Sequence, residues 1–309
     1  MGPFRAWLRA AFSSPRTARQ RERLFALACI SPTVFLISAV IVYPALFSFW
    51  LSLQHRDLFA PTGTFVGVAN YAYLLSRQEF WQSFWNGIVF SFGSVALQTL
   101  LGVGLALLLN RPFKGRDFVR SALLFPYLVP SVVAILVIRW MLNDLYGILN
   151  SWLLQLQIVS APVAWLGTPT MAMLSLVGIN TWMFYPFVMI VVLARLQMIP
   201  LELYEAARVD GAGPLSQFRN ITLPQIHAVL ALLVLVRTLW MFNKFDTVWL
   251  ITQGGPFGTT QTLPVMAYLR AFSLYELGTG AAVGMLLCVL LVGIFVVYHR
   301  WMLRAAERL

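Results

Sequence analysis

Charged residues are scarce in this sequence. Only 11% of its 309 residues are Asp, Glu, Lys or Arg, whereas 60% are hydrophobic, and the mean hydropathy is +0.77. A soluble core of this size has no room for so much apolar surface, so lipid must be the solvent of the folded chain. The scarcity of charge excludes an ordinary soluble domain and predicts an integral membrane protein.

Cysteine and histidine are also scarce, with two and three residues. Cys29 and Cys288 fall within apolar runs, so we expect packing residues rather than an extracellular disulfide, and two thiols are too few for a metal cage. His55, His227 and His299 stand far apart, without the spacing of metal ligands. The sequence also lacks a phosphate-binding G-x-x-x-x-G-K-[ST] loop and a G-x-S-x-G context for a nucleophile. These absences predict a protein that is not an enzyme, without catalytic residues or a metal site.

Long apolar runs, by contrast, are abundant. Six of them have the length and composition of membrane-spanning helices. They cover residues 25–53, 84–109, 118–142, 170–194, 226–251 and 278–299. The first run is longer than the apolar part of a secretory signal and no small-residue cleavage site follows it, so we interpret it as a retained span. The sequence therefore predicts an all-α protein with six transmembrane helices.

Lys and Arg are distributed unevenly between the two sides that these spans define. Sixteen of the 22 fall on the side of the two termini and four on the other side. By the positive-inside rule, both termini are cytoplasmic. The net charge of +11 is then explained without nucleic acid, and we expect the Arg-rich N-terminus to lie against anionic lipid head groups.

One polar segment, YEAARVDGAGPLSQFRNITLP at 204–224, lies between two apolar runs on the cytoplasmic side. Its pattern predicts a short helix, a sharp turn at Gly211 and Gly213, which can take positive φ, and a second helical piece at about 215–221. Pro224 then stands where the next span begins, a position that proline tolerates. The segment is too short and too polar to span a membrane. It either lies on the membrane surface, fills a groove of a partner or is a solvated loop.

The spacing within this segment resembles a family signature, E-A-A-x3-G-x9-I-x-L-P. The fixed positions are Glu205, Ala206, Ala207, Gly211, Ile221, Leu223 and Pro224. This is the EAA loop of binding-protein-dependent ABC transporter permeases, in which it forms the coupling helix that docks in a cleft of the ATP-hydrolysing subunit. The resemblance implies that the residues coupled to the ATPase are Glu205, Ala206, Ala207, Asp210 and Gly211.

Three further segments resemble the carbohydrate branch of that family, its maltose, glycerol-phosphate and lactose-type first permease subunit. They are FDTVWLITQGGPFGTTQTLPVMAYLRAF at 245–272, the stretch at 65–91 and YGILNSWLL at 146–154. The resemblance implies a MetI-like importer fold in a bacterial or archaeal plasma membrane. The implied partners are a second homologous permease subunit, two ATP-binding subunits that hold ATP and Mg, an extracytoplasmic solute-binding protein and membrane lipid. The resemblance implies neither a cofactor bound by this chain nor a nucleic acid as a partner.

The predicted organisation follows from the spans and this resemblance. Residues 1–24 are a cytoplasmic Arg-rich N-terminus, and 25–83 hold the first span and an external segment. Residues 84–303 form the core permease domain, with the EAA loop at 201–224, and 304–309 are a cytoplasmic tail.

Polar groups within the fourth and fifth runs are the candidates for a substrate pathway, because such groups are costly in hydrocarbon and tend to face a cavity. Aromatic faces and amide or ammonium donors are the chemistry that a saccharide site needs. The candidates are Asn180, Trp182, Tyr185, Trp240, Met241, Asn243 and Lys244. By the resemblance, Asn180, Met241 and Lys244 match pathway-facing positions of maltose-type subunits.

Each candidate also has a structural alternative. The aromatic residues are equally suited to packing or to the membrane interface, and Lys244 and Asp246 to snorkelling at the end of a span. By the resemblance, the position of Lys244 is occupied by Asn in maltose-type subunits. The identity of the ligand therefore stays open, and an acidic ligand is one alternative. Arg237 lies mid-span and requires an internal partner or a water-filled cavity, whereas Arg139 is expected to snorkel. Asn86 and Gln98 are expected to join helices by hydrogen bonds.

The function that these features predict is a permease subunit of an ATP-driven, binding-protein-dependent importer of an oligosaccharide, polyol or sugar derivative. One alternative is an importer permease for a non-carbohydrate solute, which the segment 245–272 disfavours. The other is a secondary transporter, which would need inverted repeats and intramembrane carboxylates. The sequence shows no repeat and only Asp246 in or near a span.

Overall fold

The computed structural model describes residues 18–59 and 62–306. Most of the predicted basic segment 1–24 and the last residues of the predicted tail 304–309 lie outside the described residues. The chain divides into two units, residues 1–50 and 51–309.

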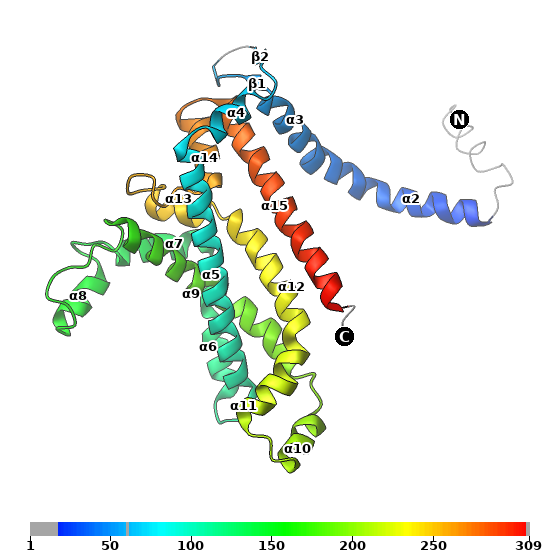
Figure 1. Cartoon of the computed structure of the whole chain (residues 1–309), viewed down its shortest axis with the longest axis vertical. Coiled ribbons are helices and arrows are strands. Elements are labelled where there is room, and N and C mark those ends of the chain that lie inside the picture. The colour runs from blue at the N-terminus through cyan, green and yellow to red at the C-terminus, as the bar shows by residue number, and fades with distance from the viewer. Residues whose placement is uncertain (1–17, 60–61, 307–309) are drawn as a thin grey trace, which may run out of the picture. The chain divides into compact units, whose positions relative to one another are not determined.

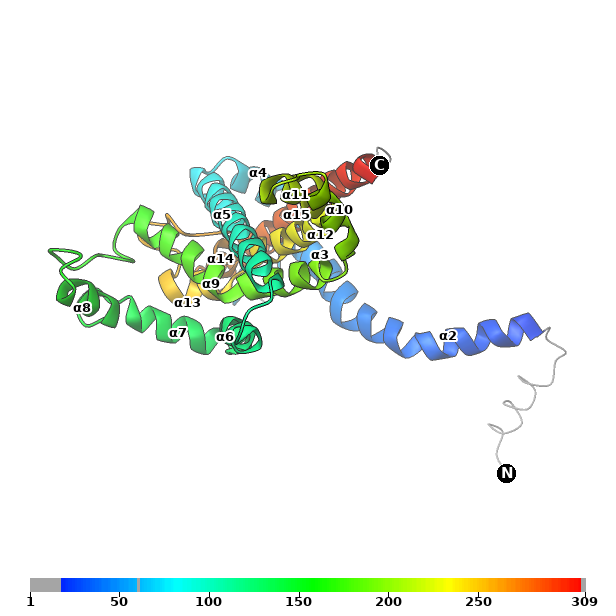
Figure 2. The ribbon, with the colours of Figure 1, turned by 90° about the horizontal axis from the view of Figure 1, so that it is seen from below.

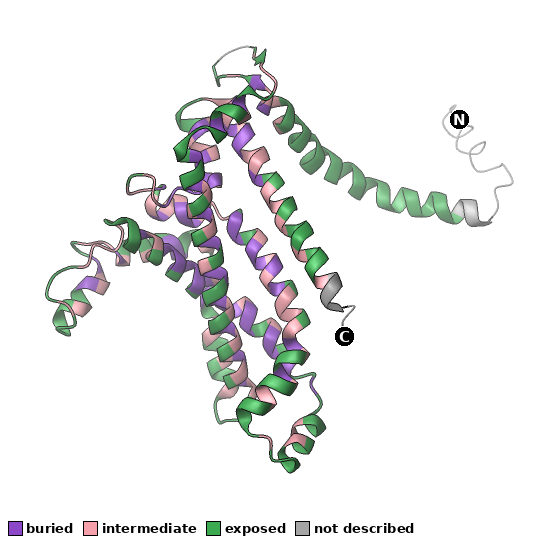
Figure 3. Ribbon diagram, viewed as in Figure 1, coloured by how far each residue is buried: buried purple, intermediate pink, exposed green. Residues whose placement is uncertain are grey.

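The described part of the first unit is a long helix with one widened turn. It consists of α2 (Ala18–Ile37), the π-helical turn η1 (Ser38–Val42) and all but the last two residues of α3 (Tyr43–Ser52) (Figure 1). In the π turn the N–H of Tyr43 bonds to the carbonyl of Ser38, which makes room before Pro44, because a proline ring clashes with the carbonyl four residues earlier in an α-helix. Nearly all its described side chains are exposed (Figure 3), as expected for an apolar span whose surroundings are lipid or another chain.

The second unit is mainly helical, with one short hairpin. Its elements are β1 (Gln54–His55), β2 (Thr64–Phe65), α4 (Ala69–Leu75), α5 (Gln78–Asn110), α6 (Arg116–Leu128), α7 (Ser131–Met141), α8 (Ile148–Gln155), α9 (Pro169–Leu196), α10 (Leu201–Val209), α11 (Pro214–Gln217), η2 (Phe218–Thr222), α12 (Leu223–Phe242), α13 (Asp246–Thr252), α14 (Leu263–Tyr268), η3 (Leu269–Ser273) and α15 (Leu277–Ala306). The strands β1 and β2 pair antiparallel, with Gln54 opposite Phe65.

Among the described residues, five helices are long and apolar enough to cross a membrane, or six if one bent pair counts as a single span. The all-α membrane class is therefore confirmed. The core lies where α5 and α9 pack along most of their length, and Gly102 of α5 permits this approach. A Cβ at Gly102 would stand 2.7 Å from Cβ of Val188 on α9, so any larger residue would push the two helices apart.

The third predicted span, 118–142, is the bent pair: α6 and α7 meet at 90°. The break has a local cause, because Pro130 has no N–H and holds Val129 in extended conformation, with φ −73° and ψ 133°. The predicted span over this run is therefore not one continuous helix but two helices that meet at a sharp bend.

The fifth predicted span also ends earlier than expected. Helix α12 stops at Phe242, and α13 begins as a separate helix at Asp246, so the run 226–251 is not continuous. The apolar character of α13 concealed this break, since periodicity alone does not distinguish a short buried helix from the end of a span. The expectation that Cys29 and Cys288 are packing residues is likewise wrong, because both are exposed. Cysteine has a small apolar side chain, so its exposure to lipid on a helix surface costs no free energy that packing against protein would recover.

Candidate functional site

Arg237 lies in the middle of α12 and is only 1% exposed. Its Nε and Nη2 donate hydrogen bonds of 3.0 and 2.8 Å to Oε1 of Gln98 on α5. No carboxylate within the described residues forms an ion pair with it. The expectation of an internal partner is therefore confirmed, and the partner is a neutral amide.

Gln98 also joins the neighbouring helices. Its Nε2 donates to the backbone oxygen of Asn180 on α9 at 3.1 Å and lies 3.7 Å from Sδ of Met241 on α12. Oδ1 of Asn180 in turn accepts a hydrogen bond of 3.4 Å from Thr247 on α13. All four side chains are buried. Gln98 thus holds α5, α9 and α12 together, as predicted for a residue that joins helices.

Four aromatic rings surround this buried charge, and we call Tyr127, Phe184, Phe187 and Trp240 the aromatic cluster. The guanidinium carbon of Arg237 lies 4.6 Å from the ring centroid of Phe184, 5.5 Å from that of Trp240 and 6.0 Å from that of Phe187. Tyr127 of α6 packs against Phe184 and Phe187. Trp240 is 48% exposed and Tyr127 40%, so the cluster has a buried side at Arg237 and an open side.

The break between α6 and α7 lies directly after Tyr127. Within the described chain, the N–H of Val129 caps no carbonyl and Pro130 has no N–H, so the last carbonyl groups of α6 lack helical partners. Irregular backbone within a membrane is tolerated only where protein covers it or where it lines a water-filled cavity. The open side of the aromatic cluster is therefore next to unpaired polar backbone.

Lys244 approaches the cluster from the end of α12. Its Nζ lies 4.8 Å from the ring centroid of Phe184 and 2.9 Å from Oδ2 of Asp246. The lysine side chain is 15% exposed and that of the aspartate 31%. The structure therefore contains a partly buried ion pair between Lys244 and Asp246, and neither residue snorkels.

At the opposite end of the unit, the predicted helix, turn and second helix are present as α10, Gly211 and α11. Gly211 has φ of +82°, where an L side chain is strained, whereas Gly213 has φ of −70°, so only one of the two glycines makes the sharp turn. The hydroxyl groups of Tyr204 and Thr222 bond at 2.9 Å and tie α10 to η2. No residue of α10 is buried. The segment 201–222, which we call the coupling segment, offers an exposed face to a partner.

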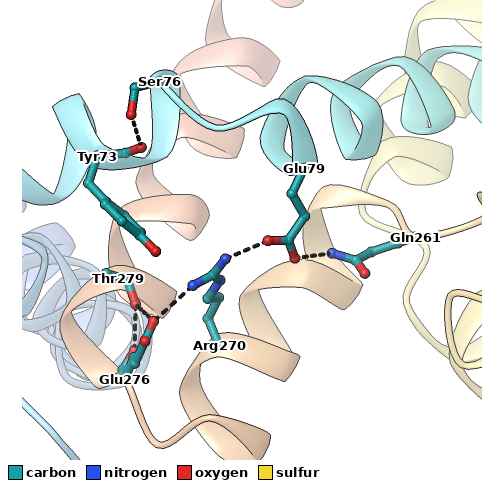
Figure 4. A network of polar contacts seen from close by, with 7 residues as sticks. All are labelled: Tyr73, Ser76, Glu79, Gln261, Arg270, Glu276 and Thr279. Carbon is teal, nitrogen blue, oxygen red and sulfur yellow. Dashed lines mark hydrogen bonds and ion pairs between the residues drawn. The ribbon is translucent and has the colours of Figure 1, made fainter. Parts of the chain in front are cut away.

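At the end of α5 near Gln78, which we call the outer end, a network of charged groups fixes the segment that follows α13 (Figure 4). Arg270 pairs with Glu79 of α5 at 2.5 Å and with Glu276 at 3.1 Å. Gln261 donates to Glu79 at 3.2 Å, and Thr279 donates to Glu276 at 2.8 Å. This network joins α5, η3 and α15.

Asn86 holds the same segment from a position two turns further along α5. Its Nδ2 donates to the backbone oxygens of Gly258 and Gln261, both at 3.0 Å. The predicted role of Asn86 in joining helices is thus more specific in the structure: it joins α5 to the loop between α13 and α14.

Residues 98–305 match the family model described as the binding-protein-dependent transport system inner membrane component. The chain belongs to this family. The matched range contains the aromatic cluster, Gln98, Arg237 and the coupling segment, and membership makes the chain a multi-pass membrane permease and not an enzyme.

Relatives of this permease match it over nearly their whole length. The trehalose/maltose transport system permease protein MalF of Thermococcus litoralis is 39% identical over 91% of this chain and 94% of its own. The sulfoquinovosyl glycerol transport system permease protein SmoG of Agrobacterium fabrum is 32% identical over 90% of both chains. In fold, the permease is similar to a chain of a bacterial ABC transporter involved in the import of the acidic polysaccharide alginate. The TM-score is 0.80 at 22% identity over 92% of this chain and 96% of that one.

The permease brings together some of the predicted pathway residues and separates others. Trp240 and Lys244 belong to or border the aromatic cluster, and Asn180 and Met241 lie buried beneath it at Gln98. The others lie elsewhere: Trp182 lines an apolar groove between α7 and α9, the hydroxyl of the buried Tyr185 donates to the Leu123 carbonyl, and the exposed Asn243 donates to the Leu239 carbonyl.

Sequence reasoning missed Tyr127, Phe184 and Phe187 of this permease. Phe184 and Phe187 follow Asn180 by four and seven residues, so they share its helical face, and this spacing was the available signal. Nothing in the sequence pattern marked Tyr127, because its contact with α9 depends on how α6 packs against α9.

Proposed function

We propose that this permease forms part of the translocation pathway of an ATP-driven sugar importer, with the aromatic cluster as its sugar-facing surface. The observation that carries the proposal is the open aromatic surface beside unpaired backbone at the break between α6 and α7. Sugar rings present C–H faces that stack on aromatic rings and hydroxyl groups that bond to carbonyl, amide and ammonium groups. The site offers both, and the names of the relatives, with trehalose/maltose and sulfoquinovosyl glycerol, support a carbohydrate.

The charges at the site favour a neutral sugar. Lys244 is paired with Asp246, and Arg237 is held by Gln98 and by aromatic faces. Neither cation therefore requires a carboxylate or sulfonate from the ligand.

The proposed partners are a second homologous permease subunit, two ATP-binding subunits that hold ATP and Mg, and an extracytoplasmic binding protein that delivers the sugar. Both termini are then cytoplasmic, and this chain holds no cofactor of its own. ATP closes the ATPase pair, the coupling segments move with it and the spans change access from one side to the other. In this chain the contacts to the ATPase are Glu205, Ala206, Ala207, Asp210 and Gly211. The absence of any buried residue in α10, with Glu205 and Ala206 exposed and Ala207 half-buried, supports this docking.

Uptake in reconstituted vesicles, with a set of neutral and acidic sugars, tests the pathway. Lys244→Ala and Trp240→Ala should raise the half-saturation concentration or lower the maximal rate, with a lost hydrogen bond at Lys244 worth roughly 0.5 to 1.5 kcal/mol. Asn180→Ala should have the same effect indirectly, because the buried amide of Asn180 bonds to Leu176 and Thr247 and so positions α9 and α13 beneath the cluster. ATPase activity stimulated by the binding protein should survive. Trp182→Ala is the matched control on the apolar groove. Unchanged uptake in all three variants would move the site to the sister subunit.

A second test addresses coupling. Gly211→Leu should abolish uptake while the protein remains inserted, because leucine at φ of +82° costs about 1 to 2 kcal/mol and displaces the turn. Gly213→Leu is the control, since its φ is ordinary and no atom lies within 4 Å of the added Cβ at either glycine. Equal uptake by the two variants would contradict a coupling role for the turn.

A further inference from the structure

A groove of about 960 Å³ runs along the second half of α5 and is closed on its other side by the coupling segment. Its α5 wall consists of leucines around Gly104, and no atom lies within 4 Å of where a Cβ of Gly104 would stand. The opposite wall includes Leu201 and Leu215, which are 71% and 79% exposed. The second unit thus leaves open an apolar groove beside a membrane-spanning helix. Figure 2 shows the ribbons of α5, α10 and α11, the helices that contribute most of its lining.

Both charged residues that line this groove are arginines, Arg111 directly after α5 and Arg208 on α10. Arg111 makes no side-chain hydrogen bond or ion pair with any residue that the structure describes. Arg208 lies 3.9 Å from Glu205, but the two side chains are 63% and 65% exposed, so this pair holds the guanidinium weakly. The groove is therefore apolar along α5 and positive where α5 ends.

We propose that this groove binds an anionic phospholipid, with an acyl chain along the leucines of α5 and the phosphate between Arg111 and Arg208. The distribution of Lys and Arg assigns this end of α5 to the cytoplasmic side, where basic residues attract anionic head groups. Guanidinium groups form strong, charge-assisted hydrogen bonds with phosphate. The N-terminal residues 1–17 of this chain carry Arg5, Arg9 and Arg16, so the same sign of charge disfavours them as the occupant.

Such a lipid contacts a span and the coupling segment at once. Its occupancy restrains α10 relative to α5, so it raises the efficiency with which ATP hydrolysis and transport are coupled. This consequence rests on the proposed function, whereas the binding itself requires only that α5 crosses a membrane.

Lipid retention by the full-length transporter tests the binding. The protein is purified from vesicles of phosphatidylcholine and phosphatidylglycerol, and the lipid that remains bound is quantified. Replacing Arg111 or Arg208 by Gln should lower phosphatidylglycerol retention about fivefold for each arginine and leave phosphatidylcholine unchanged. Arg116→Gln is the matched control, because Arg116 is the first residue of α6, five positions after Arg111, but does not line the groove.

A second variant tests the apolar part without altering charge. Gly104→Leu should fill the groove and displace the acyl chain, whereas Gly293→Leu, which also meets no atom within 4 Å, should retain the lipid. Unchanged phosphatidylglycerol retention in both the arginine variants and Gly104→Leu would overturn the proposal. So would specific cross-linking of a cysteine at Leu101 to a helix of another subunit, because that would identify a protein as the occupant.

ATPase stimulation tests the consequence separately. It should be lower in vesicles of phosphatidylcholine alone and in the Arg111→Gln variant, and equal stimulation with and without phosphatidylglycerol would refute the effect on coupling. Failure of the parent protein to transport any sugar would refute the proposed function, and the lipid retention measurement would still decide the binding.

Discussion

Arg237 and Arg270 are both buried, at 1% and 7% exposure, yet their surroundings differ completely. Arg237 lies in the middle of a span and is held by a neutral amide and aromatic faces. Arg270 lies at the outer end and is held by Glu79 and Glu276, whose side chains are 49% and 37% exposed.

The difference follows from the cost of removing charge from water. A carboxylate beside Arg237 would add a second desolvation penalty at the depth where it is largest, whereas an amide oxygen and ring quadrupoles stabilise the cation at less cost. At the outer end the carboxylates keep contact with water and can pair with arginine at little penalty. The position of a cation along the span thus determines which kind of partner holds it.

The largest expected effect comes from removing the neutral partner. Gln98→Leu should lower the free energy of unfolding by about 3 kcal/mol, because it leaves the guanidinium of Arg237 buried without an acceptor. Gln98→Glu is the control, since it keeps the acceptor and should be less destabilising. Thermal unfolding in detergent measures both, and a Gln98→Leu variant as stable as the parent would contradict this account of the site.

Removing the cation at the outer end should have a smaller effect. Arg270→Gln should cost about 1 to 2 kcal/mol, because its two carboxylates are partly hydrated. Burial by itself would lower the pKa of Arg270, but its bond to Glu276 and the charge of Glu79 raise the pKa above its ordinary value. Because its pKa is raised on folding, the arginine contributes its full stability at every pH below the range in which an unfolded arginine loses its proton.

The loss caused by Arg270→Gln should accordingly be equal at about pH 6 and about pH 8. Arg77→Gln is the matched control, because Arg77 packs on the ring of Tyr73 but has no ion pair among the described residues. A loss that disappears at either pH would show that another titrating group carries the effect.

The smallest effect on stability should come from removing the mid-span cation itself. Arg237→Met leaves no carboxylate unpaired and removes a charge that is buried away from water. It should therefore change the free energy of unfolding by less than about 1 kcal/mol. Sugar uptake should nevertheless fall, because the rings of Phe184, Phe187 and Trp240 lose the group around which they pack. Normal uptake by a stable Arg237→Met protein would show that the charge does not position the cluster.

The sequence was sufficient for features that depend on local pattern. Apolar length predicted the spans, the glycine and proline spacing predicted the helix and turn at 201–224, and the depth of Arg237 predicted an internal partner. Features that depend on contacts between distant segments were missed. The sequence is apolar on both sides of the break at Pro130, so its composition predicts one continuous span. The contact of Tyr127 with α9 depends on how α6 and α9 pack. The pairing of Arg270 with Glu79 joins residues separated by most of the chain.

The π turn η2 repeats in the second unit the arrangement seen before Pro44, because the N–H of Leu223 bonds to the carbonyl of Phe218 immediately before Pro224. Such a turn inserts one residue into the helical count, which offsets the rotational phase of α11 and α12 by about 100°. The direction in which the coupling segment faces is therefore set relative to the face of α12 that carries Arg237. A deletion of one residue here would leave both helices intact and misalign the two ends of the protein.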